Sequence, residues 1–408
     1  IMVKYSINTF QLFHQMLIII ISIWSIDASA NTIKIPFRYV QSFIIIDAKL
    51  EGVLPMSFIF DTGAEQNIII DRGYTDIFKD IYLKEIDIFG ADLNQPIPAL
   101  LTRALNIQIA ESLPVLRQCI VLKEKKINFD AIVGENIHGI LTGSIFKDYI
   151  IEINYRKSFI LLHKYDSRIS LKKFTKHKIK ITKNKPYIDC RIQMPNMEFK
   201  TLSLLLDSGA ALSSILYSNA DTSVMIPQNV IPSNLGSGLG GLIHGVAGRI
   251  KKFCIDSIYC IDDLVIHFQT VETDYIQNES KLKQGIIGNQ ILEKFLILID
   301  YKNEYVYLKA DKEFATAPKY DKSGLFITKG GTDLSKFYVS NVMPNSPAAD
   351  QGIMVGDEIL SLNTIPKLFL SLQKIQNILA KKPSKSIKIK LKRGKKLIKA
   401  QFTLRNLI

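Results

Sequence analysis

Two short stretches decide the fold, Asp61-Thr62-Gly63-Ala64 and Asp207-Ser208-Gly209-Ala210. Each follows an apolar run rich in β-branched, leucine and aromatic residues, which is Met56–Phe60 in the first case and Phe199–Leu206 in the second. Such runs predict β-strands, and the Asp and Gly residues predict a turn where each strand ends. The two aspartates are 146 residues apart.

The same spacing relates a second pair of stretches. Gly139–Tyr155 aligns without gaps on Gly285–Tyr301, again at an offset of 146 residues. Two landmarks that keep one spacing indicate an internal duplication. We therefore predict a mostly β protein with two homologous lobes, residues 31–168 and 169–312, related by a pseudo-twofold axis.

The paired aspartates carry the predicted chemistry. Two carboxyl groups brought face to face cannot both ionise, so they share one proton. The charged member can activate a water molecule, and the protonated member can polarise a peptide carbonyl. We predict Asp61 and Asp207 as catalytic residues, supported by Thr62, Gly63, Ser208 and Gly209. Two ordinary Asp-Gly turns in a duplicated β domain are the alternative.

At these residues the chain resembles the pepsin and retropepsin superfamily of aspartic endopeptidases. The resemblance covers both lobes and includes a later apolar-apolar-Gly turn, Ile286-Ile287-Gly288, for which lobe one has Thr142 in place of the glycine. It implies a two-lobed acid-protease β-barrel fold, with Asp61 and Asp207 as the dyad. It also implies polypeptide substrates, no metal or other cofactor, and Thr62 and Ser208 as the hydroxyls that lock the lobes together.

The residue after each glycine bears on the pH dependence. Pepsin-like enzymes usually carry Ser or Thr there, whereas Ala64 and Ala210 stand here, as in retropepsins. A missing hydroxyl removes a hydrogen bond from the ionised carboxylate and therefore raises the lower pKa of the dyad. We expect a mildly acidic to near-neutral pH optimum.

The resemblance also implies a β-hairpin flap over the cleft. The glycine-rich run Gly236–Gly248 lies between the second aspartate and the last strands, and we assign Gly240, Gly241 and His244 to the flap and the substrate cleft. The run contains G-x-G-x-x-G, but no βαβ pattern surrounds it, so a dinucleotide site is not expected. A plain flexible loop with a solvated histidine is the alternative.

After a polar linker over residues 313–322 the sequence changes character. Residues 323–408 resemble a PDZ domain, a small β-sandwich or barrel with short helices, most specifically in Val355–Asn363. The resemblance places the carboxylate-binding loop on Gly324, Leu325 and Phe326, where a peptide C-terminus would add as a strand to the sheet edge. The amphipathic stretch Leu368–Leu379 is expected to form the helix beside that groove.

Positive charge is concentrated in this last segment. The chain carries a net charge of +14, and sixteen Lys/Arg against five Asp/Glu from residue 321 onward leave only +3 for the rest. Ile387, Ile389 and Leu391 alternate with lysines, which is typical of a half-buried strand with a solvated face. Attraction to an anionic envelope surface stays open as an alternative, and nucleic-acid binding is not expected.

The first thirty residues predict an export signal. A lysine precedes a short apolar stretch, Met16–Trp24, and Ala28-Ser29-Ala30 fits a signal-peptidase site. A cleaved signal over residues 1–30 implies a periplasmic or secreted protein, an uncleaved one implies membrane association, and an ordinary buried segment is the third alternative. In an oxidising compartment Cys254 and Cys260 can close a short loop, with the other two cysteines as buried thiols.

Together these features predict an exported, monomeric aspartic endopeptidase whose PDZ module binds peptide C-termini or gates the cleft. A catalytically inactive, protease-like binding or scaffold protein of the cell envelope is the main alternative. A retropepsin-type homodimer is a further alternative, which one aspartate per lobe makes unnecessary.

Overall fold

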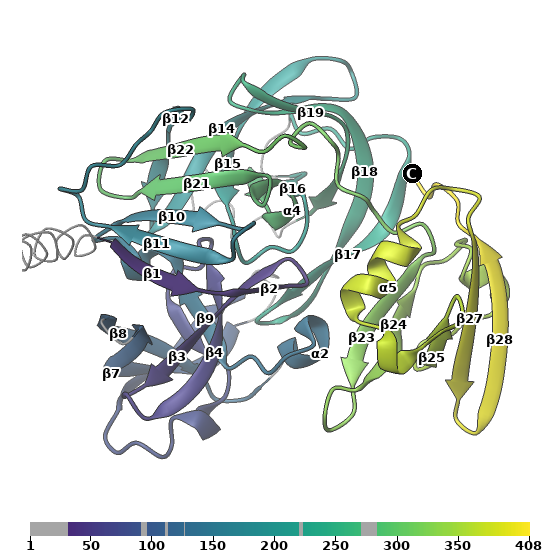
Figure 1. Cartoon of the computed structure of the whole chain (residues 1–408), viewed down its shortest axis with the longest axis horizontal. Helices are drawn as coiled ribbons and strands as arrows, with labels where there is room; N and C mark the ends of the chain where they lie inside the picture. The colour runs from purple at the N-terminus through teal and green to yellow at the C-terminus, as the bar shows by residue number, and fades with distance from the viewer. Residues whose placement is uncertain (1–31, 91–95, 111–112, 126, 220–222, 271–283) are drawn as a thin grey trace, which may run out of the picture.

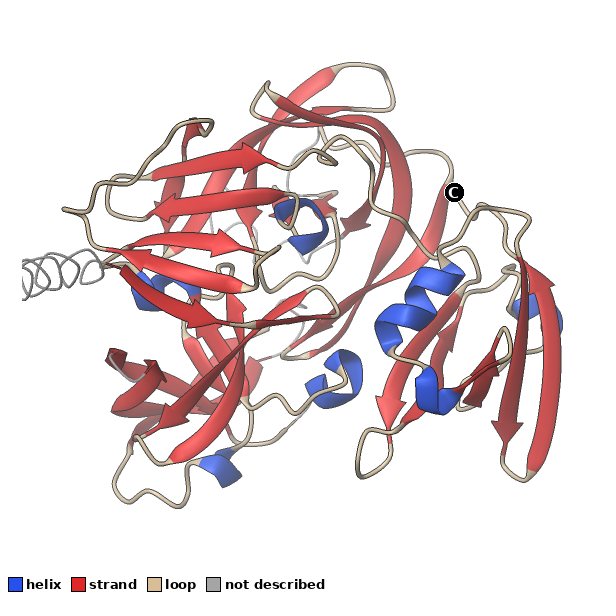
Figure 2. Cartoon of the chain, viewed as in Figure 1, coloured by secondary structure: helices blue, strands red, loops and turns tan. Residues whose placement is uncertain are grey.

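The computed structural model describes residues 32–90, 96–110, 113–125, 127–219, 223–270 and 284–408. The export signal predicted over residues 1–30 lies outside the described residues. The described chain is mostly β-structure with a few short helices, as the sequence predicts (Figure 2). Within it, no helix is long and apolar enough to cross a membrane.

The first half of the chain forms an eight-stranded, barrel-like sheet (Figure 1). Its strand order is β2-β3-β4-β9-β5-β8-β7-β6, and a further pairing of β3 with β7 curls the sheet on itself. The strands are β2 (Arg38–Val40), β3 (Phe43–Leu50), β4 (Leu54–Asp61), β5 (Asn67–Ile69), β6 (Tyr82–Phe89), β7 (Pro96–Ala110), β8 (Leu113–Leu122) and β9 (Gly139–Thr142), with helix α2 (Phe129–Val133) before the last.

The second half builds a second sheet in the same way. Its order is β13-β14-β15-β20-β16-β19-β18-β17, with a further pairing of β14 with β18. The elements are β13 (Lys180–Thr182), β14 (Lys185–Gln193), β15 (Phe199–Leu206), β16 (Ser214–Tyr217), β17 (Val230–Gly238), β18 (Gly241–Ile255), β19 (Tyr259–Gln269) and β20 (Gly285–Ile287), followed by α4 (Asn289–Leu292).

The strands that lead to the two aspartates pair with equivalent residues in the two sheets. Strand β4 pairs in parallel with β9 through Phe58 opposite Gly139, and β15 pairs in parallel with β20 through Leu204 opposite Gly285. The second pair of residues follows the first at the offset of 146 seen in the sequence. The duplication is therefore present in the topology as well as in the sequence.

A six-stranded sheet joins the two halves. Its order is β1-β11-β10-β21-β22-β12. The strands are β1 (Thr32–Pro36), β10 (Ile150–Asn154), β11 (Phe159–His163), β12 (Thr175–Lys178), β21 (Phe295–Asp300) and β22 (Tyr305–Ala310). At its centre β10 and β21 run antiparallel, with Ile151 opposite Ile299 and Ile153 opposite Ile297. Ile151 and Ile297 are equivalent at the offset of 146 residues, and so are Ile153 and Ile299. Each pair therefore maps onto the other, as a local twofold axis between the two strands requires.

One apolar core runs through both halves. The cluster contains, for example, Phe60 and Phe146 from the first half and Leu206 and Leu292 from the second. The rings of Phe60 and Phe146 stack with their centroids 5.8 Å apart. Each such side chain contributes about 1.5–3 kcal/mol when fully buried, so the shared core resists separation of the halves.

The C-terminal segment has a separate apolar core and a sheet of order β23-β24-β25-β27-β28, with β26 paired to β25. Its elements are β23 (Leu325–Gly330), β24 (Lys336–Val342), β25 (Glu358–Leu362), β26 (Ile365–Pro366), α5 (Leu372–Leu379), β27 (Ser386–Arg393) and β28 (Lys396–Thr403). Strand β27 buries Ile387, Ile389 and Leu391 and exposes the lysines between them, which confirms the predicted alternation.

Helix α5 begins later than the sequence pattern predicts. The amphipathic stretch from Leu368 was expected to be helical throughout, but the helix starts at Leu372. Ser371 lies before it, and its side chain accepts a hydrogen bond from the N–H of Lys374 at 3.1 Å. This N-cap explains the later start, because the cap residue itself has an extended backbone.

Candidate active site and peptide groove

The two predicted aspartates meet on the pseudo-twofold axis. Asp61 is the last residue of β4, and Asp207 directly follows β15. Each carboxyl group affects the pKa of the other, so the two are close neighbours, and both residues line one cavity. The structure therefore brings together two side chains that are 146 residues apart in the sequence.

Crossed hydrogen bonds hold the two turns. The N–H of Thr62 donates to Oγ of Ser208 at 3.0 Å, and the N–H of Ser208 donates to Oγ1 of Thr62 at 3.0 Å. Each hydroxyl then donates across the axis, Thr62 to the carbonyl of Leu206 at 2.5 Å and Ser208 to that of Phe60 at 2.8 Å. Both hydroxyl-bearing residues are buried. Thr62 and Ser208 thus hold the two turns together through hydrogen bonds that each residue both donates to and accepts from the opposite turn.

The two glycines allow close approach of each turn to the opposite carboxyl group. A Cβ atom on Gly63 would lie 2.6 Å from Cγ of Asp207, and one on Gly209 would lie 2.3 Å from Cγ of Asp61. Real Cβ atoms essentially never approach so closely. Both positions therefore require glycine because of the neighbouring carboxyl group, and any side chain there would push the dyad apart.

Backbone amides bind the two carboxyl groups unequally. Oδ1 of Asp61 accepts hydrogen bonds from the N–H groups of Gly63 at 2.7 Å and Ala64 at 3.0 Å. Oδ1 of Asp207 accepts one such bond, from Gly209 at 2.8 Å. Hydrogen bonds to a carboxylate favour its charged form. Asp61 is therefore the better site for the negative charge.

Burial raises the pKa of both carboxyl groups, since the protein around them disfavours the charged form. The pKa of Asp207 is raised further by the negative charge of Asp61, and its shift is the larger one. The amide bonds of Gly63 and Ala64 oppose the rise for Asp61. A pair with these properties keeps one proton, which resides on Asp207.

Lys185 lies close enough to influence the dyad. It is the first residue of β14, is buried, and lines the same cavity. Its positive charge lowers the pKa of both aspartates. Its Nζ is 3.7 Å from Oε2 of Glu65, one residue beyond the first turn. The sequence pattern gave no signal for this role, because Lys185 is distant from both aspartates along the chain.

The loop behind Asp61 accommodates the unexpected Thr142. Its hydroxyl donates to the carbonyl of Ala64 at 2.8 Å. In the second half, where Gly288 stands in its place, the N–H of Asn289 donates to the carbonyl of Ala210 at 2.8 Å. The two equivalent alanine carbonyls are thus held by different donors. The departure from the expected glycine leaves the turn supported.

The cavity above the dyad has a volume of about 1410 Å³. This exceeds the roughly 300–1,000 Å³ typical of small-molecule pockets. Side chains from both halves line it, among them Phe43, Ile59, Tyr187 and Ile286. A cavity of this volume, which also extends along residues of the C-terminal unit, has room for an extended polypeptide.

The glycine-rich run forms the predicted hairpin. Strands β17 and β18 pair up to Gly238 opposite Gly241, and Gly240 lies in the turn between them. Leu239 at the tip is buried in an apolar cluster whose other buried members all come from residues 43–140. The hairpin of the second half therefore closes across the cavity onto the first half, a contact that the sequence did not indicate.

His244 does not face the dyad. It is exposed on β18 and lines a separate cavity of about 140 Å³, with Ser233 on one side and Phe326 and Met343 on the other. The main cavity is instead lined by Gly236, Gly238 and Leu239 from this hairpin. His244 thus shares a small cavity with residues of the C-terminal unit and does not line the cavity of the dyad.

The predicted peptide groove lies between β23 and α5. Strand β23 is an edge strand of its sheet, and residues from both elements line the main cavity. At the groove start the N–H of Gly324 donates to Oδ1 of Asp321 at 2.6 Å, and that of Leu325 donates to Oγ of Ser323 at 3.1 Å. Two of the three predicted loop residues therefore have side-chain acceptors, which an incoming carboxylate has to replace.

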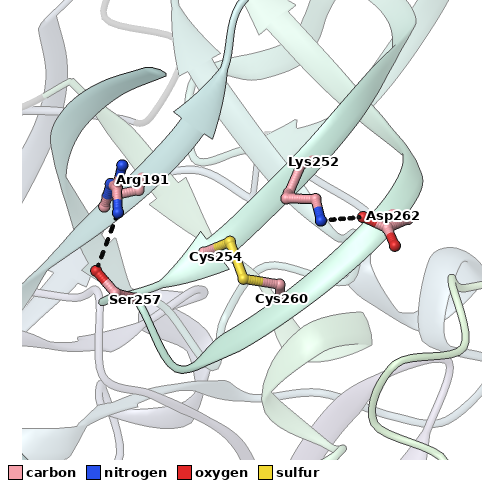
Figure 3. Close-up of a disulfide and its surroundings, with 6 residues drawn as sticks. All are labelled: Arg191, Lys252, Cys254, Ser257, Cys260 and Asp262. Atoms are coloured by element: carbon pink, nitrogen blue, oxygen red, sulfur yellow. Dashed lines mark hydrogen bonds and ion pairs between the residues drawn. A yellow bond between two sulfur atoms is a disulfide. The ribbon is translucent and has the colours of Figure 1, made fainter. Parts of the chain in front are cut away.

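Of the four cysteines, Cys254 and Cys260 form a disulfide between β18 and β19 (Figure 3). Cys119 and Cys190 are free and buried. Both outcomes agree with the arrangement considered from the sequence. In the described part of the chain, no three His, Cys, Asp or Glu side chains are grouped as a metal site would require.

A family model for the PDZ domain matches residues 338–393. The match begins within β24, ends with β27, and lies inside the C-terminal segment for which we predicted this domain. Residues 338–393 therefore form a PDZ domain, a peptide-binding module whose members generally bind peptide C-termini. No curated protein matches the chain.

The crossed lock predicts a measurable loss of stability in Ser208→Ala. The change leaves the N–H of Thr62 and the carbonyl of Phe60 without their buried partner, at about 1–3 kcal/mol for each group. We expect the free energy of unfolding in urea to fall by about 2 kcal/mol or more. Ser203→Ala is the matched control, because among the described residues its buried hydroxyl has no hydrogen-bond partner. Equal losses in the two variants would contradict the lock.

Proposed function

We propose that this protein is an aspartic endopeptidase of the pepsin and retropepsin type, with lobes at residues 31–168 and 169–312. One observation carries the proposal: duplicated turns bring two carboxyl groups together, each packed against the glycine of the opposite turn, and both aspartates line one large cavity. The crossed hydroxyls and the obligatory glycines support it. The PDZ domain adds a second peptide-binding element to the same chain.

The unequal pair suggests how the two aspartates divide the work. Asp61, which accepts two amide hydrogen bonds, is the carboxylate that takes a proton from a water molecule. The oxygen of that water molecule attacks the peptide carbonyl carbon. Asp207 gives its proton to the carbonyl oxygen, which produces a tetrahedral diol. Asp61 then returns a proton to the amide nitrogen while Asp207 takes one from the diol. The C–N bond breaks, and the pair again holds one proton.

Export fits the cysteine chemistry. The Cys254–Cys260 disulfide supports an oxidising compartment, because such bonds rarely persist in a reducing cytosol. With the signal predicted over residues 1–30, we propose a periplasmic or secreted enzyme. The shared core and the presence of both aspartates in one chain support a monomer.

Replacing either aspartate tests the enzyme against the inactive binding protein. We expect Asp61→Asn and Asp207→Asn each to lower the cutting of an unstructured protein by roughly 10²–10⁴-fold, because either change removes the shared-proton pair. A pepstatin-type inhibitor should block the unchanged protein. Fragments are measured by gel and mass spectrometry, and circular dichroism checks folding.

Asp262→Asn serves as the control, because Asp262 is exposed and pairs only with Lys252 in the described contacts (Figure 3). It should cut like the unchanged protein. If the unchanged protein and all three variants leave the substrate intact, the endopeptidase proposal is wrong and the non-hydrolysing alternative is favoured.

Lys185 sets the expected pH dependence. Its positive charge lowers the pKa of both carboxyl groups, so Lys185→Met should raise both values. The acidic limb of kcat/KM, where the pair gains a second proton, and the basic limb, where it loses its last proton, should both move to higher pH. For the unchanged protein we expect a mildly acidic to near-neutral optimum.

The control is Lys200→Met, which removes a lysine that pairs with Glu198 and does not line the cavity. Lys185→Arg should keep the original limbs. A rate maximum well below pH 3, or limbs that stay in place in Lys185→Met, would count against this electrostatic role.

A further inference from the structure

The PDZ groove opens into the cavity of the dyad. The residues that line the one cavity of about 1410 Å³ include Asp61 and Asp207 as well as Phe326 and Thr328 of β23 and Gln376 of α5. In Figure 1, helix α5 lies on the side of the C-terminal unit that faces the rest of the chain. The groove and the dyad therefore share one continuous cavity.

Helix α2 forms the junction between groove and cleft. Lys329, near the end of β23, donates through Nζ to the carbonyl of Gly134 at 3.3 Å, just beyond α2. Phe129 and Ile132 of α2 line the common cavity. The end of the groove away from Gly324 thus abuts an apolar surface that continues toward the aspartates.

The direction of a bound peptide follows from this arrangement. A C-terminal carboxylate at the loop Gly324–Phe326 lies at the beginning of β23, so the preceding peptide residues must run toward its end. That end is the one next to α2, whose Phe129 and Ile132 line the common cavity. The residues upstream of the C-terminus are therefore led toward the dyad rather than into solvent.

The charge around the groove start favours an anionic end. Lys319 lines the cavity there, and Lys322 follows Asp321, so two lysines stand near one aspartate at the groove start. The acid group at this point, Asp321, is occupied by the N–H groups of Ser323 and Gly324. A peptide carboxylate meets a local excess of positive charge.

We infer that one polypeptide occupies both elements at once: its free C-terminal end lies in the PDZ groove while an upstream segment lies across Asp61 and Asp207. This inference rests on the proposed function. Its consequence is that the C-terminal fragment released by hydrolysis has a nearly constant length. That fragment must exceed about six residues, since β23 alone spans six residues and a peptide strand beside it covers a similar number.

The test uses an unstructured peptide made of identical repeats, in three total lengths, each with a free C-terminal carboxylate or a C-terminal amide. Because every repeat offers the same local sequence, side-chain preference cannot select the cut. We expect the acid peptides to be cut at least tenfold faster than the amides. Mass spectrometry should show one C-terminal fragment length in all three acid peptides.

Two variants of α5 supply the structural control. Gln376 is exposed and faces the cavity, so Gln376→Trp fills the groove and should abolish both the preference for the acid and the constant fragment length. Lys374 is exposed on the same helix and does not line the cavity, so Lys374→Trp should behave like the unchanged protein.

The outcomes separate this inference from the proposed function. Equal cutting of acids and amides, or fragments that lengthen with the peptide, would overturn the inference and leave the endopeptidase intact. If neither peptide is cut by the unchanged protein, the proposed function fails and the inference fails with it.

Discussion

The crossed hydrogen bonds between Thr62 and Ser208 hold together two carboxyl groups that mutual repulsion would separate if both were ionised. Each turn is fixed by a donor and an acceptor from the other, in surroundings where an unpaired polar group costs about 1–3 kcal/mol. Neither turn can therefore shift alone. Burial then raises the pKa of both carboxyl groups, so a single proton stays between them. The sheets and the shared core contribute to this site because they hold the ends of β4 and β15, and with them the two aspartates, next to each other.

The duplication explains why these turns meet. Two copies of one unit that pack about a twofold axis place identical residues next to each other only on that axis. The antiparallel pairing of β10 with β21 defines the axis, since Ile151 faces Ile299 and Ile153 faces Ile297. The requirement for glycine at positions 63 and 209 follows from the same geometry, because each backbone lies against the carboxyl group of the other copy.

The features that the sequence predicts well are local or repeated. Strand runs, the turns at their ends and the offset of 146 residues predict the mostly β fold, and the lysine alternation predicts β27. What the sequence did not reveal depends on contacts between distant segments. The charge of Lys185 near the dyad, the burial of Leu239 in the first half and the position of His244 against the C-terminal unit are of this kind. The late start of α5 was local but depended on a cap rather than on periodicity.

A single chain permits an asymmetry that a pair of identical chains cannot have. Lys185, the first residue of β14, stands where the first half has Phe43, the first residue of β3, so among the described residues this positive charge has no counterpart at the equivalent position. Asp61 accepts two amide bonds where Asp207 accepts one, and Asp207 has the higher pKa. The hydrogen bonds therefore favour the negative charge on Asp61 and the proton on Asp207. Because the hairpin of the second half closes onto the first half and the C-terminal unit lines the same cavity, the surroundings of the two aspartates are asymmetric as well.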